Sequence, residues 1–196
     1  MIAYLKGKLV RKEPAFVIID VNGIGYQVLI SLNTYSAIKD REDITLLTVL
    51  VVREDAHILY GFGTPGEKQM FQHLVSVNGV GPGTAIMVLS SMNPDDLRQA
   101  IIRGETPTLQ AVKGIGAKTA QRLILELGDK LKKDGGDFGG PAAETGYNTV
   151  RNEALSALMT LGISRVAAEK SIEAILKKSG NTLSLEELVK IALKNA

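Results

Sequence analysis

Two short glycine motifs are the residues of this chain best suited to binding chemistry. The segments VNGVGPGTA (77–85) and VKGIGAKTA (112–120) match each other at an offset of 35 residues. Both contain a glycine-hydrophobic-glycine triplet, Gly79-Val80-Gly81 in the first copy and Gly114-Ile115-Gly116 in the second. A self-match at a fixed offset is typical of a duplicated supersecondary unit.

Each motif favours phosphate as its ligand. Glycine permits positive φ angles and a close approach of the backbone to a bound group. A helix is expected to begin directly after each triplet, so its first N–H groups and its positive dipole end would face outward. Such amides hold phosphate without reading bases. The competing interpretation is that these glycines only terminate helices.

Two basic residues follow the second triplet. Lys118 and Arg122 are four residues apart, so they share one face of the expected helix and are natural phosphate partners. A solvated basic face is the alternative. The stretch GIGAKT does not fit a nucleotide-binding P-loop, which needs glycine at the positions of Val112 and Ala117. The candidate DNA-binding residues are Gly79, Val80, Gly81, Gly83, Gly114, Ile115, Gly116, Lys118, Thr119 and Arg122.

An acidic pair forms a second candidate. Glu54 and Asp55 lie at the tip of an expected hairpin between two strands. Because acidic residues are common in turns, the pair alone is also compatible with an ordinary solvated loop.

The residues around the acidic pair predict a small barrel over residues 1–63. Pro14 precedes the second strand, and Asn22-Gly23 is a strong signal for a tight hairpin. Five strands with a helical turn after the third indicate an OB-like barrel, with any other small antiparallel β-domain as the alternative. The expected strands are 2–10, 15–21, 24–31, 44–53 and 56–62, and the helical turn is 32–38.

Helices are expected in the rest of the chain. Residues 64–133 predict five helices that carry the two motifs, beginning with an N-cap at Thr64, Pro65 and Glu67. Residues 134–147 are rich in glycine and predict a flexible linker. Residues 148–196 predict a small three-helix domain of the kind that docks a partner. Its loop at 159–163 resembles the loop of ubiquitin-associated-like (UBA-like) domains, although a plain helix cap fits as well.

Composition narrows the function classes. The chain of 196 residues has 23 basic and 21 acidic residues, and the excess lies in residues 64–134. There is no cysteine, which excludes disulfides and thiolate chemistry. The two histidines, His57 and His73, make a poor metal set, so we expect no metal and no cofactor. No signal peptide or long apolar span is present, which predicts a cytoplasmic protein without a membrane anchor.

The order of these parts resembles the RuvA family, the Holliday-junction-binding subunits of the bacterial RuvA–RuvB branch-migration complex. The resemblance covers the whole chain and rests on VVRED (51–55), LYGF (59–62), NGVGP (78–82), GIG (114–116) and KTA (118–120).

The resemblance implies a multi-domain α+β fold and a non-catalytic role in recombination, DNA repair and the SOS response. It implies a homotetramer, or an octamer of two tetramers, that holds the four arms of a junction through its hairpins. Glu54 and Asp55 would form an acidic pin at the crossover. The C-terminal domain would dock RuvB, a hexameric ATPase, and RuvC resolvase is a further implied partner. The chain departs from the family pattern at Gly83 and Ala117, where basic residues are usual, so we expect fewer charged phosphate contacts.

Three other function classes compete with junction binding. A DNA glycosylase or nuclease would need a catalytic constellation near a hairpin, and none is present in the sequence. A single-strand or RNA-binding barrel would need aromatic stacking platforms, and the few aromatics lie at core-like positions. A generic duplex-binding repair subunit with helix-hairpin-helix motifs remains the main alternative.

Overall fold

The computed structural model describes residues 1–133, 146–179 and 183–194. The chain divides into two compact units, residues 1–140 and 141–196, which are described separately here. The predicted linker, 134–147, lies almost entirely outside the described residues.

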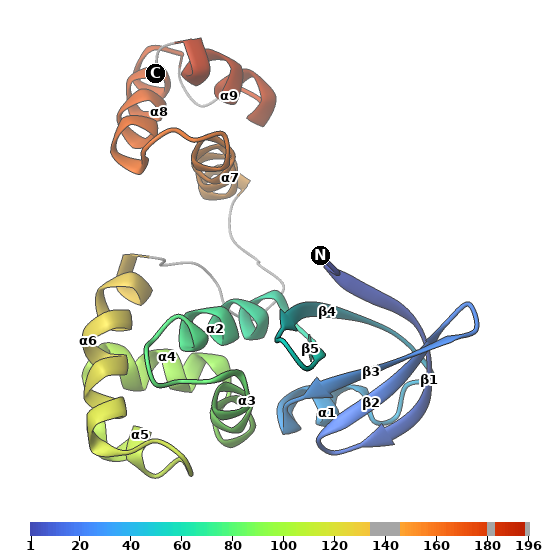
Figure 1. Cartoon of the computed structure of the whole chain (residues 1–196). Coiled ribbons are helices and arrows are strands. Elements are labelled where there is room, and N and C mark those ends of the chain that lie inside the picture. The colour runs from blue at the N-terminus through green and yellow to red at the C-terminus, as the bar shows by residue number, and fades with distance from the viewer. Residues whose placement is uncertain (134–145, 180–182, 195–196) are drawn as a thin grey trace. The chain divides into compact units, whose positions relative to one another are not determined.

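The first unit begins with a closed barrel (Figure 1). The strands follow one another in the order β1-β2-β3-β5-β4, with β3 and β5 parallel and the other neighbours antiparallel. The elements are β1 (Tyr4–Glu13), β2 (Phe16–Val21), β3 (Ile24–Ile30), α1 (Leu32–Ile38), β4 (Asp43–Val52) and β5 (His57–Phe62). The OB-like barrel predicted from the sequence is confirmed.

Strand β1 is longer than expected at its C-terminal end. Its first half pairs with β4 and its second half with β2, and the register shifts between Leu9 and Arg11. This bulge lets one strand serve two neighbours. The predicted turn at Asn22-Gly23 is confirmed by φ angles of 52° and 89°.

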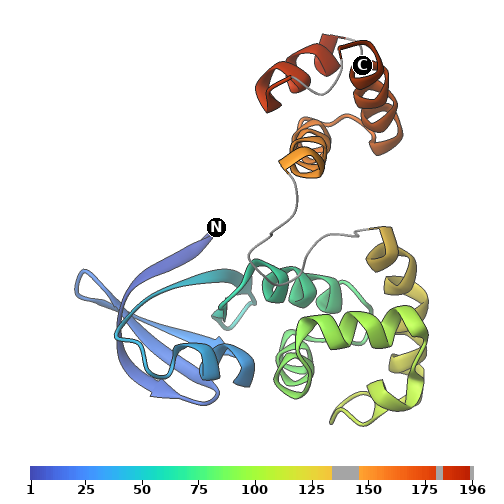
Figure 2. The ribbon, with the colours of Figure 1, turned by 180° about the vertical axis from the view of Figure 1, so that it is seen from behind.

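Five helices complete the described part of the first unit. They are α2 (Pro65–Val75), α3 (Pro82–Ser91), α4 (Pro94–Arg103), α5 (Thr106–Gln110) and α6 (Ala117–Lys133), and Figure 2 shows them from behind. Helix α5 begins at Thr106. Glu105 is its N-cap, because the Glu105 carbonyl accepts the first bond of the helix, from Leu109 N at 3.3 Å.

Strand β5 joins the two cores of the first unit. Leu59 points into the barrel core, whereas Tyr60 and Phe62 belong to the core of the helices. Phe71 of α2 packs against both aromatic rings, with centroid distances of 5.1 Å to Tyr60 and 4.9 Å to Phe62. Alternation along one strand therefore fixes the barrel to the helices.

The second unit contains α7 (Gly146–Thr160), α8 (Arg165–Ser179) and α9 (Leu185–Lys194) around a small apolar core. Helix α9 begins with a capping box formed by Ser184 and Glu187. Ser184 Oγ accepts from Glu187 N at 3.3 Å, and the Glu187 carboxylate accepts from Ser184 N at 3.0 Å. These hydrogen bonds with Ser184 lower the pKa of Glu187.

Candidate nucleic-acid interface

The two glycine triplets adopt the same backbone structure. Gly79 and Gly114 both have a φ of +93°. In each turn the hydrophobic residue donates its N–H to the valine three residues earlier, at 3.1 Å, for Val80 and for Ile115. The sequence repeat is therefore also a structural repeat, of two helix-hairpin-helix turns.

The hydrophobic residue of each triplet is an anchor. Val80 and Ile115 are 4% and 5% exposed and belong to one core cluster of the helices. The glycines on either side of them are exposed. One buried side chain thus anchors each turn in the core, while the backbone of the turn faces solvent.

Backbone amides lie open at both turns. The α3 ladder begins with Ala85 N donating to the Gly81 carbonyl, and the α6 ladder with Ala120 N donating to Gly116, both at 2.9 Å. The amides before these residues have no acceptor within their own helix. A side chain added at Gly81, Gly83 or Gly116 would meet no atom within 4 Å, so the surface there is unobstructed. Each turn can hold an anionic oxygen.

The two turns are not chemically equal. Pro82 begins α3 and has no N–H, whereas Ala117 at the same position of α6 keeps its amide. The exposed Lys118 has Gly83 as its counterpart in the first copy, and the half-buried Thr119 has Thr84. The exposed Lys113 has the neutral Asn78 as its counterpart. The second turn therefore presents one more amide and two more positive charges, on Lys113 and Lys118.

Arg122 is not a partner of the second turn alone. Its Nη1 donates to the Asn78 carbonyl of the first turn at 2.9 Å, and its Nε lies 3.8 Å from Glu126 Oε1. Met87 occupies the equivalent position of the first copy and reaches in the opposite direction. A side chain at Gly114 would begin 3.3 Å from Met87 Cε, and one at Gly79 would begin 3.9 Å from Arg122 Nη1. Each copy thus contacts the glycine turn of the other.

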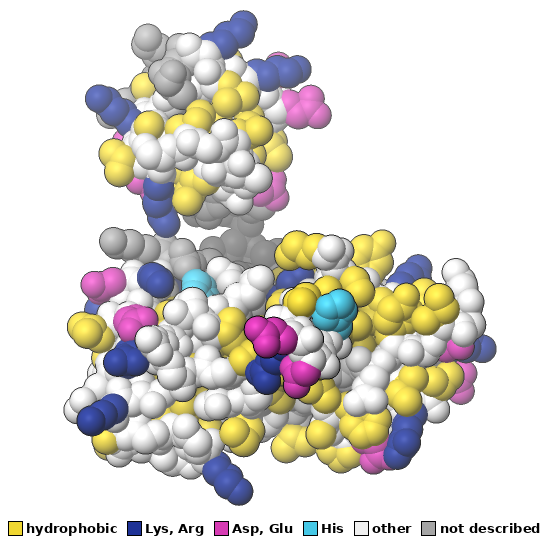
Figure 3. All heavy atoms as spheres, in the orientation of Figure 1, with side chains coloured by type: hydrophobic (Ala, Val, Ile, Leu, Met, Phe, Trp, Pro, Cys, Tyr) yellow, Lys and Arg dark blue, Asp and Glu magenta, His cyan; other side chains and the backbone are white. Residues whose placement is uncertain are grey.

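The acidic pair lies at the exposed tip between β4 and β5. Arg53 N donates to the Ala56 carbonyl at 2.8 Å and closes the turn over Glu54 and Asp55. Figure 3 shows acidic side chains together over this end of the two strands. Among the described residues, neither carboxylate has an ion-pair partner. Burial raises the pKa of Tyr60 at the base of the tip, and the nearby Arg53 guanidinium offsets part of that rise.

Comparison with known proteins identifies the family. The family models "RuvA N terminal domain", "SAM-like Helix-hairpin-helix tandem" and "RuvA, C-terminal domain" match residues 1–61, 71–129 and 149–196. A protein of Cytophaga hutchinsonii named "Holliday junction branch migration complex subunit RuvA" is 52% identical, over 99% of both chains. The chain belongs to the RuvA family.

Two further RuvA relatives with the same name show comparable similarity. The protein of Amoebophilus asiaticus is 48% identical over 99% of this chain and 100% of its own length. That of Christiangramia forsetii is 48% identical over 99% of each chain. The RuvA resemblance that the sequence motifs indicated is therefore confirmed over the full length.

In this RuvA family member the structure brings together the predicted residues of both turns on one helical module, and it places the acidic pair on the barrel. No described helix is both long enough and apolar enough to span a membrane. Within the described residues there is also no group of three potential metal-ligating side chains.

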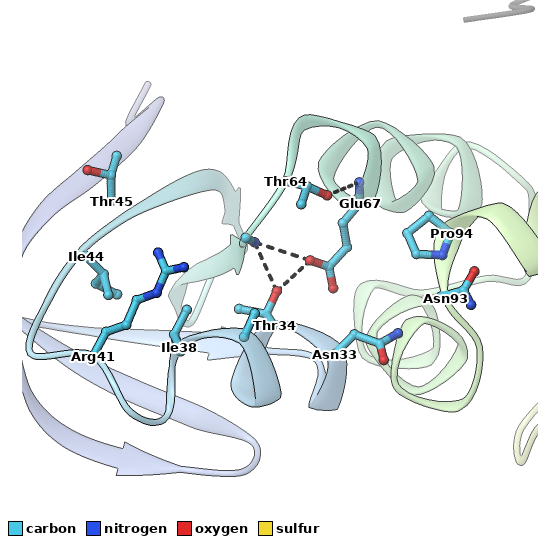
Figure 4. Close-up of a pocket in the computed structure, with 12 residues that line it drawn as sticks. Asn33, Thr34, Ile38, Arg41, Ile44, Thr45, Thr64, Glu67, Asn93 and Pro94 are labelled. Carbon is cyan, nitrogen blue, oxygen red and sulfur yellow. Dashed lines mark hydrogen bonds between the residues drawn. The ribbon is translucent and has the colours of Figure 1, made fainter. Parts of the chain in front are cut away.

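Glu67 of this RuvA chain is buried, which its sequence pattern did not indicate. Glu67 was interpreted as part of an N-cap, and Thr64 Oγ1 does accept from Glu67 N at 3.2 Å. The Glu67 carboxylate, however, turns to the barrel and accepts a hydrogen bond from Ser31. It accepts another from Thr34, which Figure 4 shows. The sequence near Glu67 gave no further sign of a buried contact, because its position three residues after Thr64 is already explained by N-capping of α2.

The second unit of the RuvA chain exposes apolar side chains around the α7–α8 turn. Met159, Leu161 and Val166 are 44%, 61% and 77% exposed. Gly162 between them has a φ of +93° and closes the turn. This surface coincides with the loop that the sequence singled out.

Proposed function

We propose that this protein binds four-way DNA junctions by their shape and holds them in an open, square-planar form. The observation that carries the proposal is the pair of matched turns, each with open amides, in one unit with an exposed acidic tip. The turns supply attraction to phosphate and the tip supplies repulsion. Membership of the RuvA family, with relatives named for the Holliday junction, supports the same assignment.

The proposed interface consists of the two glycine turns and the polar side chains at the start of α6. The amides of Gly81, Gly83 and Gly116 and the side chain of Lys118 hold phosphates of a duplex arm, while Val80 and Ile115 fix the turns. Because these contacts are to the backbone, base pairs can exchange without any change of contact. Arg122 couples the turns and still offers N–H donors to solvent.

Glu54 and Asp55 act where arms meet. Two carboxylates that form no ion pair with any described residue repel phosphates that approach within about a Debye length, ~8 Å at physiological salt. A stacked junction brings strands closer at its centre than an open one does. The tip therefore favours the open form, and four copies around a fourfold axis would match the symmetry of an open junction.

The remaining parts of the proposal concern assembly. We assign residues 1–63 to the barrel with its pin, 64–133 to duplex binding and 148–196 to docking the RuvB ATPase, joined by 134–147. The exposed apolar surface at Met159, Leu161 and Val166 supports a docking role for the second unit. The chain itself is non-catalytic in this scheme, and ATP hydrolysis belongs to RuvB. A homotetramer or paired tetramers in the cytoplasm, with RuvC as a further partner, completes it.

The test compares a four-way junction with a linear duplex of the same arm sequence at equal salt. Fluorescence anisotropy gives both dissociation constants. We expect the junction to bind at least about a hundredfold more tightly, a difference of ~2.7 kcal/mol. Equal affinity would favour the generic duplex-binding subunit instead.

A further inference from the structure

The buried carboxylate of Glu67 lies where the barrel meets the helices (Figure 4). Glu67 is 4% exposed and is the only acidic residue among the buried side chains of the described chain. It accepts hydrogen bonds from Ser31 Oγ, from Thr34 Oγ1 at 2.5 Å and from Gly63 N at 3.2 Å. Two of these donors belong to the barrel segment at α1, and Glu67 itself belongs to α2.

Helix α1 also hydrogen-bonds to α3, the helix that follows the first glycine turn. Leu32 N donates to Ser90 Oγ at 3.1 Å. Asn33 Nδ2 donates to the carbonyls of Leu89 at 2.7 Å and Met92 at 3.1 Å, at the C-terminal end of α3. The other end of α3 forms the first glycine turn. The barrel is thus hydrogen-bonded directly to a helix that presents phosphate-binding amides.

The acidic tip is connected to the same place through β5. This strand of six residues begins just after the tip and ends at Phe62, next to Gly63. A strand of that length spans roughly 20 Å. The orientation of the barrel at Glu67 therefore sets where Glu54 and Asp55 stand relative to both turns.

Hydrogen bonds to a buried carboxylate are orientation-specific in a way that apolar contacts are not. A rotation of the barrel would strip hydrogen-bond donors from a carboxylate that is only 4% exposed, which is unfavourable. A cavity of about 420 Å³ lies beside the network, lined in part by Ala37, Ile38, Asn93 and Pro94. Thr34 and Glu67 also line this cavity, so their hydrogen bonds lie at its edge and add to the aromatic packing of β5 on α2.

We propose that Glu67 is a positioning residue that locks the barrel, and with it the acidic tip, at one angle to the hairpin turns. This proposal rests on the proposed function. A duplex arm touches the turns alone, and Val80 and Ile115 anchor both turns in one core. A junction requires turns and tip at fixed relative positions, and preorganisation of the two lowers the cost of binding it. Loss of the lock should weaken junction binding more than duplex binding.

The experiment uses the full chain with Glu67→Ala, and Glu67→Gln as the conservative variant that keeps one acceptor oxygen. Thr48→Val is the matched control, because it removes a buried hydrogen bond within the barrel, from Thr48 Oγ1 to the Ile2 carbonyl at 2.8 Å. Anisotropy measures junction and duplex dissociation constants for each variant. We expect Glu67→Ala to weaken junction binding about tenfold and duplex binding less than twofold, with Glu67→Gln between it and the wild type. Thr48→Val should leave the ratio unchanged.

A second readout measures the angle itself. Because the chain lacks cysteine, spin labels can be placed at Gln27→Cys on the barrel and Gln99→Cys on α4, both exposed. Labelled chain is diluted into unlabelled chain, so that only distances within one chain are seen. We expect a narrow distance distribution that Glu67→Ala broadens and Thr48→Val does not.

The outcomes separate the two proposals. An unchanged distribution in Glu67→Ala, or equal losses of junction and duplex affinity, would overturn the lock. If the wild-type chain shows no preference for junctions, the proposed function fails. The distance distributions then still decide whether Glu67 fixes the barrel.

Discussion

Arg122 donates a hydrogen bond to the carbonyl of Asn78, 2.9 Å away and 44 positions earlier in the sequence. The two residues belong to different copies of the repeat. The guanidinium therefore ties α6 to the first glycine turn. It also places a positive charge beside that turn, where Gly83 stands in place of a basic residue.

Loss of this tie should loosen the first turn. Arg122→Lys keeps the charge but loses the planar guanidinium with its several donors. We expect faster amide hydrogen exchange in residues 77–81, measured by mass spectrometry, and a stability loss below about 1 kcal/mol because the side chain is half exposed. Arg103→Lys is the control, since Arg103 forms a solvent-exposed pair with Glu105 at 3.8 Å. Unchanged exchange at the first turn would show that the hydrogen bond has no positioning role.

Charge at the two turns should appear in the salt dependence of duplex binding. Gly83→Lys adds a cation where a side chain meets no atom within 4 Å, and Lys118→Ala removes its counterpart. We expect the slope of log K against log salt to steepen by about 0.9 per added contact and to flatten by the same amount per lost one. Titrations from low to high salt measure it. A steep slope that Lys118→Ala leaves untouched would mean that other lysines carry the contacts.

The positive φ of the turns predicts a strong effect of alanine. Gly79→Ala and Gly114→Ala each force a side chain into the left-handed region, at a cost of about 1 kcal/mol or more. Gly114→Ala also crowds Met87 at 3.3 Å. We expect a lower unfolding midpoint in urea together with weaker duplex binding.

Gly128→Ala in α6 is the matched control for the turn glycines. A side chain there meets no atom within 4 Å, and alanine favours a helix over glycine by about 1 kcal/mol. The control should gain stability and bind DNA normally. Turn variants that behave like the control would refute the structural role of the turn glycines.

The acidic tip should affect junctions and leave duplexes alone. Glu54→Gln combined with Asp55→Asn removes both charges and little volume. We expect the variant to bind a junction with altered affinity and to support slower RuvB-driven branch migration, measured with a synthetic junction. Asp40→Asn with Glu42→Gln, an exposed acidic pair elsewhere on the barrel, is the control. Unchanged junction binding and migration in the tip variant would exclude a role for the pin.

The cap of α9 predicts a pH dependence. Hydrogen bonds with Ser184 hold the pKa of Glu187 below its ordinary value of 4.5. Stabilisation of the cap is therefore complete above the unfolded pKa and is lost as the pH falls through the lower folded pKa. Glu187→Ala should reduce α9 helicity, read from NMR chemical shifts of the full chain, at neutral pH and not in strong acid. Glu186→Ala, next to it, should show no such difference. An effect of Glu187→Ala that persists unchanged in acid would contradict the charged cap.

Local signals were sufficient for the turns. The residue type of Gly79 and Gly114 was enough to indicate a positive φ at both positions. The sequence repeat also indicated where the following helices begin. The Asn22-Gly23 turn is equally local and was predicted, and the Ser184 capping box follows a local sequence rule of the same kind. The binding role of the turn residues is still a prediction.

Contacts between segments that are distant in the sequence could not be predicted from local sequence patterns. Arg122 was assigned to the second turn because helix spacing places it near Lys118, and only tertiary packing brings it to Asn78. Glu67 fits the pattern of a capping box with Thr64. Its carboxylate nevertheless binds the buried hydroxyls of Ser31 and Thr34 at α1 and not the N-terminus of its own helix. In both residues a local rule described the backbone correctly and missed the partner of the side chain.

The open junction is the central claim, and its most direct test is fluorescence energy transfer between labelled arm ends of a four-way junction. In magnesium buffer the free junction is stacked, so some pairs of arms are closer than others. At saturating protein we expect all neighbouring arm pairs to show equal transfer, as in a square-planar form. A stacked pattern that persists at saturation would contradict the account.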